Sequence, residues 1–175
     1  MLLGYPGVAL DDPLRPALDV LDTAMSGLSS QLATEIREKR GLAYYAGATH
    51  RPGLGTGLFV VYAGTRAEAL PEVRALMDAE GVRLRGAGLT AEEFERARRQ
   101  IVADHEMSLQ DNQGLALACA LNELYGVGYA YDFAIPKRME ALTREAVRAA
   151  AAAVLSTNRE AVSVVLPAAE GPGKL

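Results

Sequence analysis

The chain has 175 residues, a length typical of one compact domain, and its 50% apolar and 23% charged residues exclude a disordered polypeptide. A net charge of −4 and a pI near 5.3 argue against binding to nucleic acid or to an anionic membrane surface, because those partners require a basic patch. The single cysteine, Cys119, cannot form an internal disulfide, and no apolar run of about 18 residues predicts a membrane span.

The chain opens at Leu2–Tyr5 in a predicted strand that ends at Pro6-Gly7. No basic-then-apolar leader precedes this strand, and we therefore expect a cytoplasmic protein. Because the chain begins so directly in a strand, a leader or a whole domain could have been left out upstream. Such a leader would make the protein periplasmic instead.

The next segments predict two helices. Asp11-Asp12-Pro13 is typical of a cap followed by proline in the first turn, and apolar residues then repeat at helical spacing at Leu14, Ala17, Leu18, Leu21 and Met25. A second helix carries Leu28, Leu32 and Ile36 on one side. Arg37 is therefore expected to point away from that apolar stripe.

A sharp turn is predicted after the second helix. Lys39 and Arg40 are cations at the negative end of a helix dipole, and Gly41 supplies the left-handed residue that ends helices. Arg37 should then lie at a helix end, and Tyr44 at the start of the following strand. A guanidinium fork and a phenol could bind a carbonyl or an oxyanion from two directions. The local pattern alone favours a structural corner with two solvated side chains.

The rest of the chain predicts alternating strands and helices. Strands at 44–48 and 58–63 surround a turn-rich segment and suggest a hairpin. Thr65 with Glu68, and Thr90 with Glu93, predict two capping boxes at the starts of long helices. Further predicted elements are helices at about 113–124 and 144–155, a last strand at 162–166 closed by proline, and a flexible tail at 168–175.

These elements predict an α+β fold. Short turns between sequential strands, with helix pairs between them, suggest a two-layer sandwich with helices packed on one face of a mostly antiparallel sheet. No linker is long enough to divide the chain, so we expect residues 1–167 to form a single domain. Glycines at 53–57 precede a strand and not a helix, which favours a hairpin loop over a phosphate-binding loop.

The chain lacks the pattern of a catalytic metal site. Its two histidines, His50 in a predicted loop and His105 on a predicted helix, are 55 residues apart. The His105-Glu106 pair has no second histidine at the spacing of an H-x-x-E-H motif. His105 continues an apolar helix stripe, so we interpret it as a partly buried structural histidine. Cys119 is predicted on an apolar helix face, where buried and inert thiols occur. We therefore expect no metal ligand in this chain.

One segment carries a specific resemblance. Ser29-Ser30-Gln31-Leu32 followed by Ile36-Arg37-Glu38-Lys39-Arg40-Gly41-Leu42-Ala43-Tyr44 resembles the signature of the non-catalytic, C-terminal half of the pitrilysin, insulysin and mitochondrial-processing-peptidase family of zinc metallopeptidases. The resemblance extends over nearly the whole chain. It implies two halves of similar α+β fold that close around an unfolded peptide, with catalytic zinc held by an H-x-x-E-H motif in the other half. It also implies substrate binding by Arg37 and Tyr44.

Two functions from different classes follow. In the first, the chain is the substrate-binding half of a zinc endopeptidase and is inactive alone; its partners are the catalytic half, on the same chain or another subunit, and the peptide substrate. In the second, it is a non-proteolytic, core-protein-like scaffold subunit of a larger complex. Both functions imply a homo- or hetero-oligomer. The presence of both Arg37 and Tyr44 favours the first.

Overall fold

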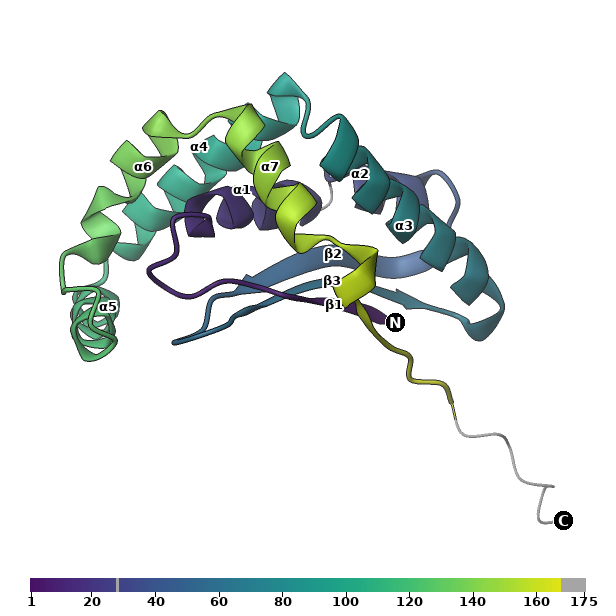
Figure 1. Ribbon diagram of the computed structural model, residues 1–175, viewed down its shortest axis with the longest axis horizontal. Coiled ribbons are helices and arrows are strands. Elements are labelled where there is room, and N and C mark those ends of the chain that lie inside the picture. The colour runs from purple at the N-terminus through teal and green to yellow at the C-terminus, as the bar shows by residue number, and fades with distance from the viewer. Residues whose placement is uncertain (28, 168–175) are drawn as a thin grey trace, which may run out of the picture.

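The computed structural model describes residues 1–27 and 29–167 and forms two layers, with helices packed above an antiparallel sheet (Figure 1). Four strands pair in the order β2-β3-β1-β4, and every neighbouring pair is antiparallel. Their bounds are β1 Leu2–Pro6, β2 Ala43–Arg51, β3 Leu58–Thr65 and β4 Ala161–Ser163. This arrangement confirms the predicted α+β sandwich and the β2–β3 hairpin.

The helical layer consists of segments of very different length. The helices are α1 Arg15–Met25, α2 Gln31–Ala33, α3 Leu70–Gly86, α4 Ala91–Ser108, α5 Asn112–Leu124, α6 Ile135–Ala141 and α7 Arg144–Val154. A π-helical turn, Thr34–Glu38, continues α2, and 3-10 turns lie at Ala67–Ala69, Tyr131–Ala134 and Thr157–Arg159. In the described part of the chain, no helix is long and apolar enough to cross a membrane.

The two faces of the sheet differ because strand side chains alternate. Leu3 and Tyr5 of β1 are opposite Val61 and Phe59 of β3, and these four residues are buried under the helices. α1 completes this core with the fully buried side chains of Leu18, Val20 and Leu21. None of the described helices lies over the opposite face (Figure 1). This face presents the side chains of Leu2, Leu58, Tyr45 and Tyr62.

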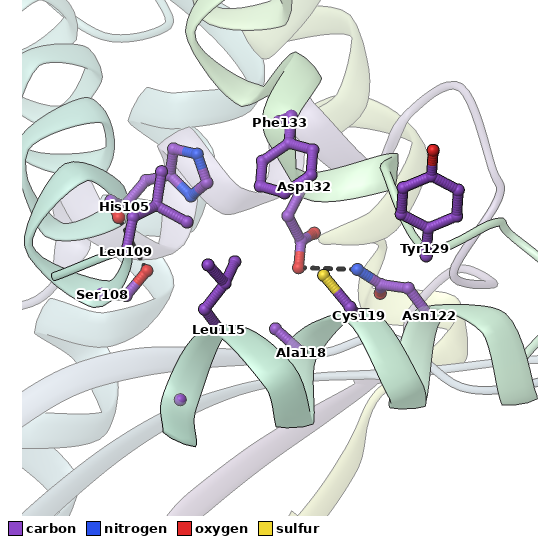
Figure 2. Close-up of a pocket in the computed structure, with 11 residues that line it drawn as sticks. His105, Ser108, Leu109, Leu115, Ala118, Cys119, Asn122, Tyr129, Asp132 and Phe133 are labelled. Atoms are coloured by element: carbon purple, nitrogen blue, oxygen red, sulfur yellow. Dashed lines mark hydrogen bonds between the residues drawn. The ribbon is translucent and has the colours of Figure 1, made fainter. Parts of the chain in front are cut away.

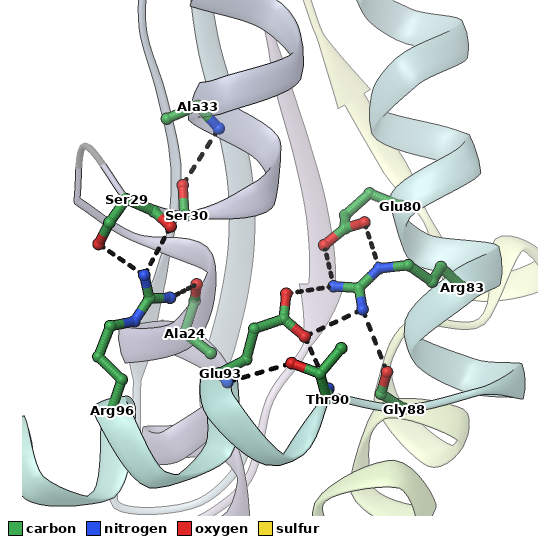
Figure 3. A network of polar contacts seen from close by, with 10 residues as sticks. All are labelled: Ala24, Ser29, Ser30, Ala33, Glu80, Arg83, Gly88, Thr90, Glu93 and Arg96. Atoms are coloured by element: carbon green, nitrogen blue, oxygen red, sulfur yellow. Dashed lines mark hydrogen bonds and ion pairs between the residues drawn. The ribbon is translucent and has the colours of Figure 1, made fainter.

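A polar network holds the corner between α3 and α4 (Figure 3). The Arg83 guanidinium donates to Glu80 Oε1 at 2.7 Å, to Glu93 Oε1 at 2.9 Å and to the Gly88 carbonyl at 3.2 Å. The Thr90 hydroxyl accepts from the Glu93 N–H, and the Glu93 carboxylate accepts from the Thr90 N–H, which confirms that predicted capping box. The start of α4 is therefore anchored to α3.

Side chains of α1 and the residue after it satisfy backbone groups at the outer edge of β2. Asp22 Oδ2 accepts from the His50 N–H at 2.9 Å, and the Ser26 hydroxyl donates to the Ala48 carbonyl at 2.9 Å. Burial raises the pKa of the Asp22 carboxyl, although the hydrogen bond from the His50 N–H favours its charged form. This part of the edge strand is thus covered without a further strand.

Several predicted boundaries are wrong. Asp12 precedes the first helix by a turn, because its carboxylate accepts from the Leu14 N–H and α1 starts at Arg15. The Thr65 capping box does not form; the Thr65 hydroxyl instead donates to the Leu42 carbonyl across the hairpin. The last strand ends at Ser163 and not at 166. Leu28 and the predicted tail at 168–175 lie outside the described residues, and the extent of the domain stays a prediction.

Candidate functional site

Arg37 lies in the π-helical turn. The Lys39 N–H donates to the Thr34 carbonyl at 3.0 Å, which closes a wider turn than in an α-helix. The chain then reverses at Gly41, whose φ of +61° is the left-handed conformation predicted for it. This geometry buries Ile36 and leaves the Arg37 side chain exposed, as the apolar pattern predicts.

Tyr44 lies at an irregularity in β2. Ala43 is opposite Thr65 and Tyr45 is opposite Gly64, so Tyr44 is an extra residue with no partner in the ladder. Such a β-bulge redirects side chains and increases strand twist. The Tyr44 side chain is 82% exposed as a result. Tyr44 therefore starts the strand as predicted, but the bulge sets where its side chain points.

These two backbone irregularities bring the predicted pair together. The Arg37 Cζ lies 5.8 Å from the centroid of the Tyr44 ring, within the range of a cation–π contact. The neighbouring cations are engaged elsewhere: Lys39 Nζ is 2.5 Å from Glu35 Oε1, and Arg40 Nη1 is 3.1 Å from Glu72 Oε1. Among the described residues, no carboxylate lies within salt-bridge distance of Arg37. Its donors are therefore available to a ligand.

An open groove lies beside this pair. It is lined by the segment 41–45 on one side and by the end of β3 with Arg66 on the other. Tyr45 lies across Gly64 in this groove, because a Cβ on Gly64 would come within 2.4 Å of the Tyr45 ring. Tyr45 and Arg66 were not predicted from the sequence as site residues. The tyrosine doublet is a visible signal, but only the bulge decides that Tyr45 pairs with Gly64 while Tyr44 has no partner in the ladder.

His50 is not in the predicted loop. It lies on β2, buried against Phe59 with 6.1 Å between the ring centroids. Its Nδ1 is 2.7 Å from Asp19 Oδ1, and its Nε2 has no hydrogen-bond partner among the described residues. His50 therefore ties β2 to α1 and is not accessible to a substrate.

His105 and Cys119 line a small cavity of about 100 Å³ between the end of α4, α5 and the turn at Tyr131–Ala134 (Figure 2). His105 is buried on α4, as predicted. Cys119 is only half-buried, because α5 has no buried residue; the predicted buried helix face is wrong. In the same cavity the Asn122 amide donates to Asp132 Oδ2 at 2.9 Å.

The described residues do not provide a zinc site. No three side chains among their His, Cys, Asp and Glu residues are close enough to hold a metal ion. Catalytic zinc sites in proteins use three such ligands. The exposed Arg37 and Tyr44 side chains can instead donate hydrogen bonds to a ligand, and the Arg37 guanidinium can also neutralise its negative charge.

Comparisons with known proteins identify relatives of this chain. The family model described as the peptidase M16 inactive domain matches residues 1–101. An uncharacterized zinc protease of Streptomyces coelicolor is 36% identical over 169 residues, which cover 95% of this chain and 36% of that protein. The chain therefore spans about a third of the length of this relative.

Solved structures share the fold. The chain superposes on the peptidase M16 inactive domain from Pseudomonas fluorescens with a TM-score of 0.82 and 25% identity, over 91% of this chain and 38% of that one. It also superposes on a chain of Complex III2 from Candida albicans with a TM-score of 0.74, over 87% of this chain and 39% of that one. At 15% identity, this second likeness concerns the fold alone.

Proposed function

Because this chain belongs to the peptidase M16 inactive domain family, we propose that it is the substrate-binding half of a zinc-dependent endopeptidase. The observation that carries the proposal is the exposed Arg37–Tyr44 pair, with the guanidinium 5.8 Å from the phenol ring and without an acidic partner among the described residues. The zinc belongs to an H-x-x-E-H-bearing catalytic half, on the same chain or on another subunit.

The two side chains supply donors to a bound peptide. Arg37 offers several N–H groups in a fixed plane and Tyr44 one O–H, and both point to solvent at the same corner. A backbone carbonyl of the peptide that lies between them accepts from both. Donors placed in this way also stabilise negative charge that develops on that oxygen during hydrolysis. The cation–π contact keeps the guanidinium near the phenol before the peptide arrives.

The alternative is a scaffold subunit without peptidase activity. A chain of Complex III2 shares this fold at 15% identity, so the fold itself also occurs within that complex. A scaffold has no need of an unpaired guanidinium beside an exposed phenol, and the pair therefore favours the peptidase. Under either function we expect the chain to work in a homo- or hetero-oligomer, and we propose a cytoplasmic location.

The test uses the enzyme assembled with its catalytic half. Arg37→Ala and Tyr44→Phe should each lower turnover of a peptide by about a hundredfold, because one well-placed donor to developing charge contributes roughly 3 kcal/mol. Both variants should keep the wild-type melting temperature, since neither side chain is buried. Peptide hydrolysis and thermal unfolding are measured side by side.

A matched control separates this role from general surface charge. Arg40→Ala removes an exposed guanidinium three residues away that is paired with Glu72, and it should leave turnover near the wild-type value. If Arg37→Ala and Tyr44→Phe retain full activity, the pair does not bind substrate. If they lower the melting temperature and not turnover, the corner is only structural.

A further inference from the structure

Three tyrosines form a continuous surface next to the Arg37–Tyr44 pair. The Tyr44 and Tyr45 rings meet edge to face, with centroids 6.4 Å apart and an interplanar angle of 86°. Tyr45 continues to Tyr62 of β3, with centroids 6.1 Å apart and an angle of 52°. The Tyr45 side chain is 56% exposed. The helix-free face of the sheet thus carries an aromatic row that begins at the proposed substrate donors.

Two cross-strand glycines allow these rings to lie close to the sheet. Gly64 is opposite Tyr45, and Gly47 is opposite Tyr62. A Cβ on Gly64 would be 2.4 Å from the Tyr45 ring, and a Cβ on Gly47 would be 2.9 Å from the Tyr62 hydroxyl. At Gly64 a Cβ would collide with the Tyr45 ring, so this ring rests on the backbone of its neighbour; at Gly47 only the tip of the Tyr62 side chain is close. A ring held in this way loses little conformational freedom when a ligand binds.

The groove above Tyr45 has a defined rim. Thr65 is fixed by its hydrogen bond to the Leu42 carbonyl, and exposed Arg66 follows it. No acidic residue lines the groove, and no carboxylate of the described residues pairs with Arg66. Aromatic faces and a cation on the rim favour an aromatic side chain beside a neutral or acidic residue, and disfavour a basic neighbour.

We propose that Tyr45, lying across Gly64, is the floor of a side-chain subsite that binds an aromatic residue of the peptide held by Arg37 and Tyr44. A side chain of the bound peptide is the expected occupant, because the groove is continuous with the donor pair. Tyr44 borders the groove and also belongs to that pair. The inference rests on the proposed function, and it adds which peptides are preferred. Tyr45 acts here through contact with a substrate side chain and not through contact with the reacting carbonyl.

The experiment compares peptides in the enzyme assembled with its catalytic half. A fluorogenic peptide is scanned with Phe, Ala and Lys at each position in turn, and kcat/KM is measured for each. We expect one peptide position at which kcat/KM is on the order of tenfold higher with Phe than with Ala, because a well-formed aromatic contact contributes about this factor. Tyr45→Ala should bring that Phe-to-Ala ratio close to one, whereas Tyr45→Phe should keep it.

A second variant reaches the subsite from the other side. Gly64→Ala places a methyl group where the Tyr45 ring now lies, so it should also abolish the Phe preference while Tyr45 itself is retained. Leu58→Ala is the control, because Leu58 is 46% exposed on the same face but outside the groove. It should leave the ratio at the wild-type value.

The outcomes separate this inference from the function on which it rests. If Tyr45→Ala keeps the wild-type Phe-to-Ala ratio at every position, or lowers all peptides equally, the subsite is wrong. Arg37→Ala should lower the rates of the Phe and Ala peptides by the same factor. If it does not change either rate, the proposed function fails, whatever Tyr45→Ala does.

Discussion

At the scale of single residues, Gly41 decides how Arg37 and Tyr44 meet. It is the one position between them with a positive φ, and the Gly41 N–H donates to the Arg37 carbonyl at 3.0 Å. The π-helical turn before it and the bulge after it then set the two side-chain directions. Neither the π-helical turn nor the bulge can be predicted from a single residue type, whereas the left-handed turn is indicated by the glycine.

Gly41→Ala should destabilise the protein by about 1 kcal/mol, because a Cβ at φ of +61° meets its own backbone. Urea unfolding of the wild-type and variant chains measures this difference. Gly86→Ala is the matched control: Gly86 is an exposed helical glycine of α3 with open space around its Cβ position, and the substitution should be neutral or stabilising by up to about 1 kcal/mol. Equal effects at the two positions would contradict the role given to Gly41.

At the scale of elements, half-buried polar contacts fix how neighbouring helices are positioned relative to each other. Glu93 shows this at the α3–α4 corner. Burial raises the pKa of its carboxyl, but the Thr90 N–H and the Arg83 guanidinium outweigh that effect and lower the pKa below its usual value. A carboxyl with a lowered pKa in the folded state stabilises the fold above the pKa that it has when unfolded, near 4.5.

Glu93→Ala should therefore lower the free energy of unfolding by about 1–2 kcal/mol at pH 7, because Arg83 and the start of α4 each lose a partner. The difference from wild type should shrink as the pH falls through the folded-state pKa of Glu93, where the wild-type carboxylate is protonated too. Urea unfolding between pH 7 and pH 3 measures it. Glu92→Ala, at an exposed neighbour, should change little; a constant difference for Glu93→Ala at every pH would refute the linkage.

At the scale of the whole molecule, the chain matches only part of a longer relative. It covers 36% of the length of its Streptomyces coelicolor relative, and its described residues hold no cluster of metal ligands. α5 has no buried residue, and Leu117 and Leu124 are exposed by 57% and 76%. We propose that a catalytic half supplies the zinc chemistry and covers part of this exposed apolar surface.

We predict that the chain alone binds no catalytic zinc and hydrolyses no peptide, because the histidines it has cannot form a three-ligand site. His50 is a buried residue of strand β2 beside Asp19, and His105 lies on helix α4. Metal analysis and a peptidase assay on the isolated chain are the measurements. Stoichiometric zinc that only chelators remove, together with peptide hydrolysis, would overturn the prediction.

A second prediction at this scale concerns assembly. The isolated chain should self-associate or pair with an H-x-x-E-H-bearing half, because contiguous exposed apolar side chains mark interaction sites. Sedimentation at several protein concentrations, with and without the catalytic half, measures this. A chain that stays monomeric at every concentration and also ignores the catalytic half contradicts it.

Much of the fold could be predicted from local patterns. Gly41, the Thr90–Glu93 capping box and the strands β1 and β3 each depend on a few neighbouring residues, so the sequence displays them. The Thr65 capping box was wrong for a tertiary reason. The Thr65 hydroxyl donates a hydrogen bond to the Leu42 carbonyl, 23 residues away in the chain, and does not cap the helix.

The sequence by itself determined the α+β class, the family resemblance and the choice of Arg37 and Tyr44, because periodicity, caps and a continuous motif are local. Only the tertiary structure decided that His50 is a buried strand residue tied to Asp19, and that Tyr45 rests on Gly64 beside the pair. A bulge changes which side chains of a strand point to each face of the sheet. The cross-strand partner of Tyr45 lies about 20 residues away in the chain. Such contacts depend on register, and register is set by the packing of the whole sheet.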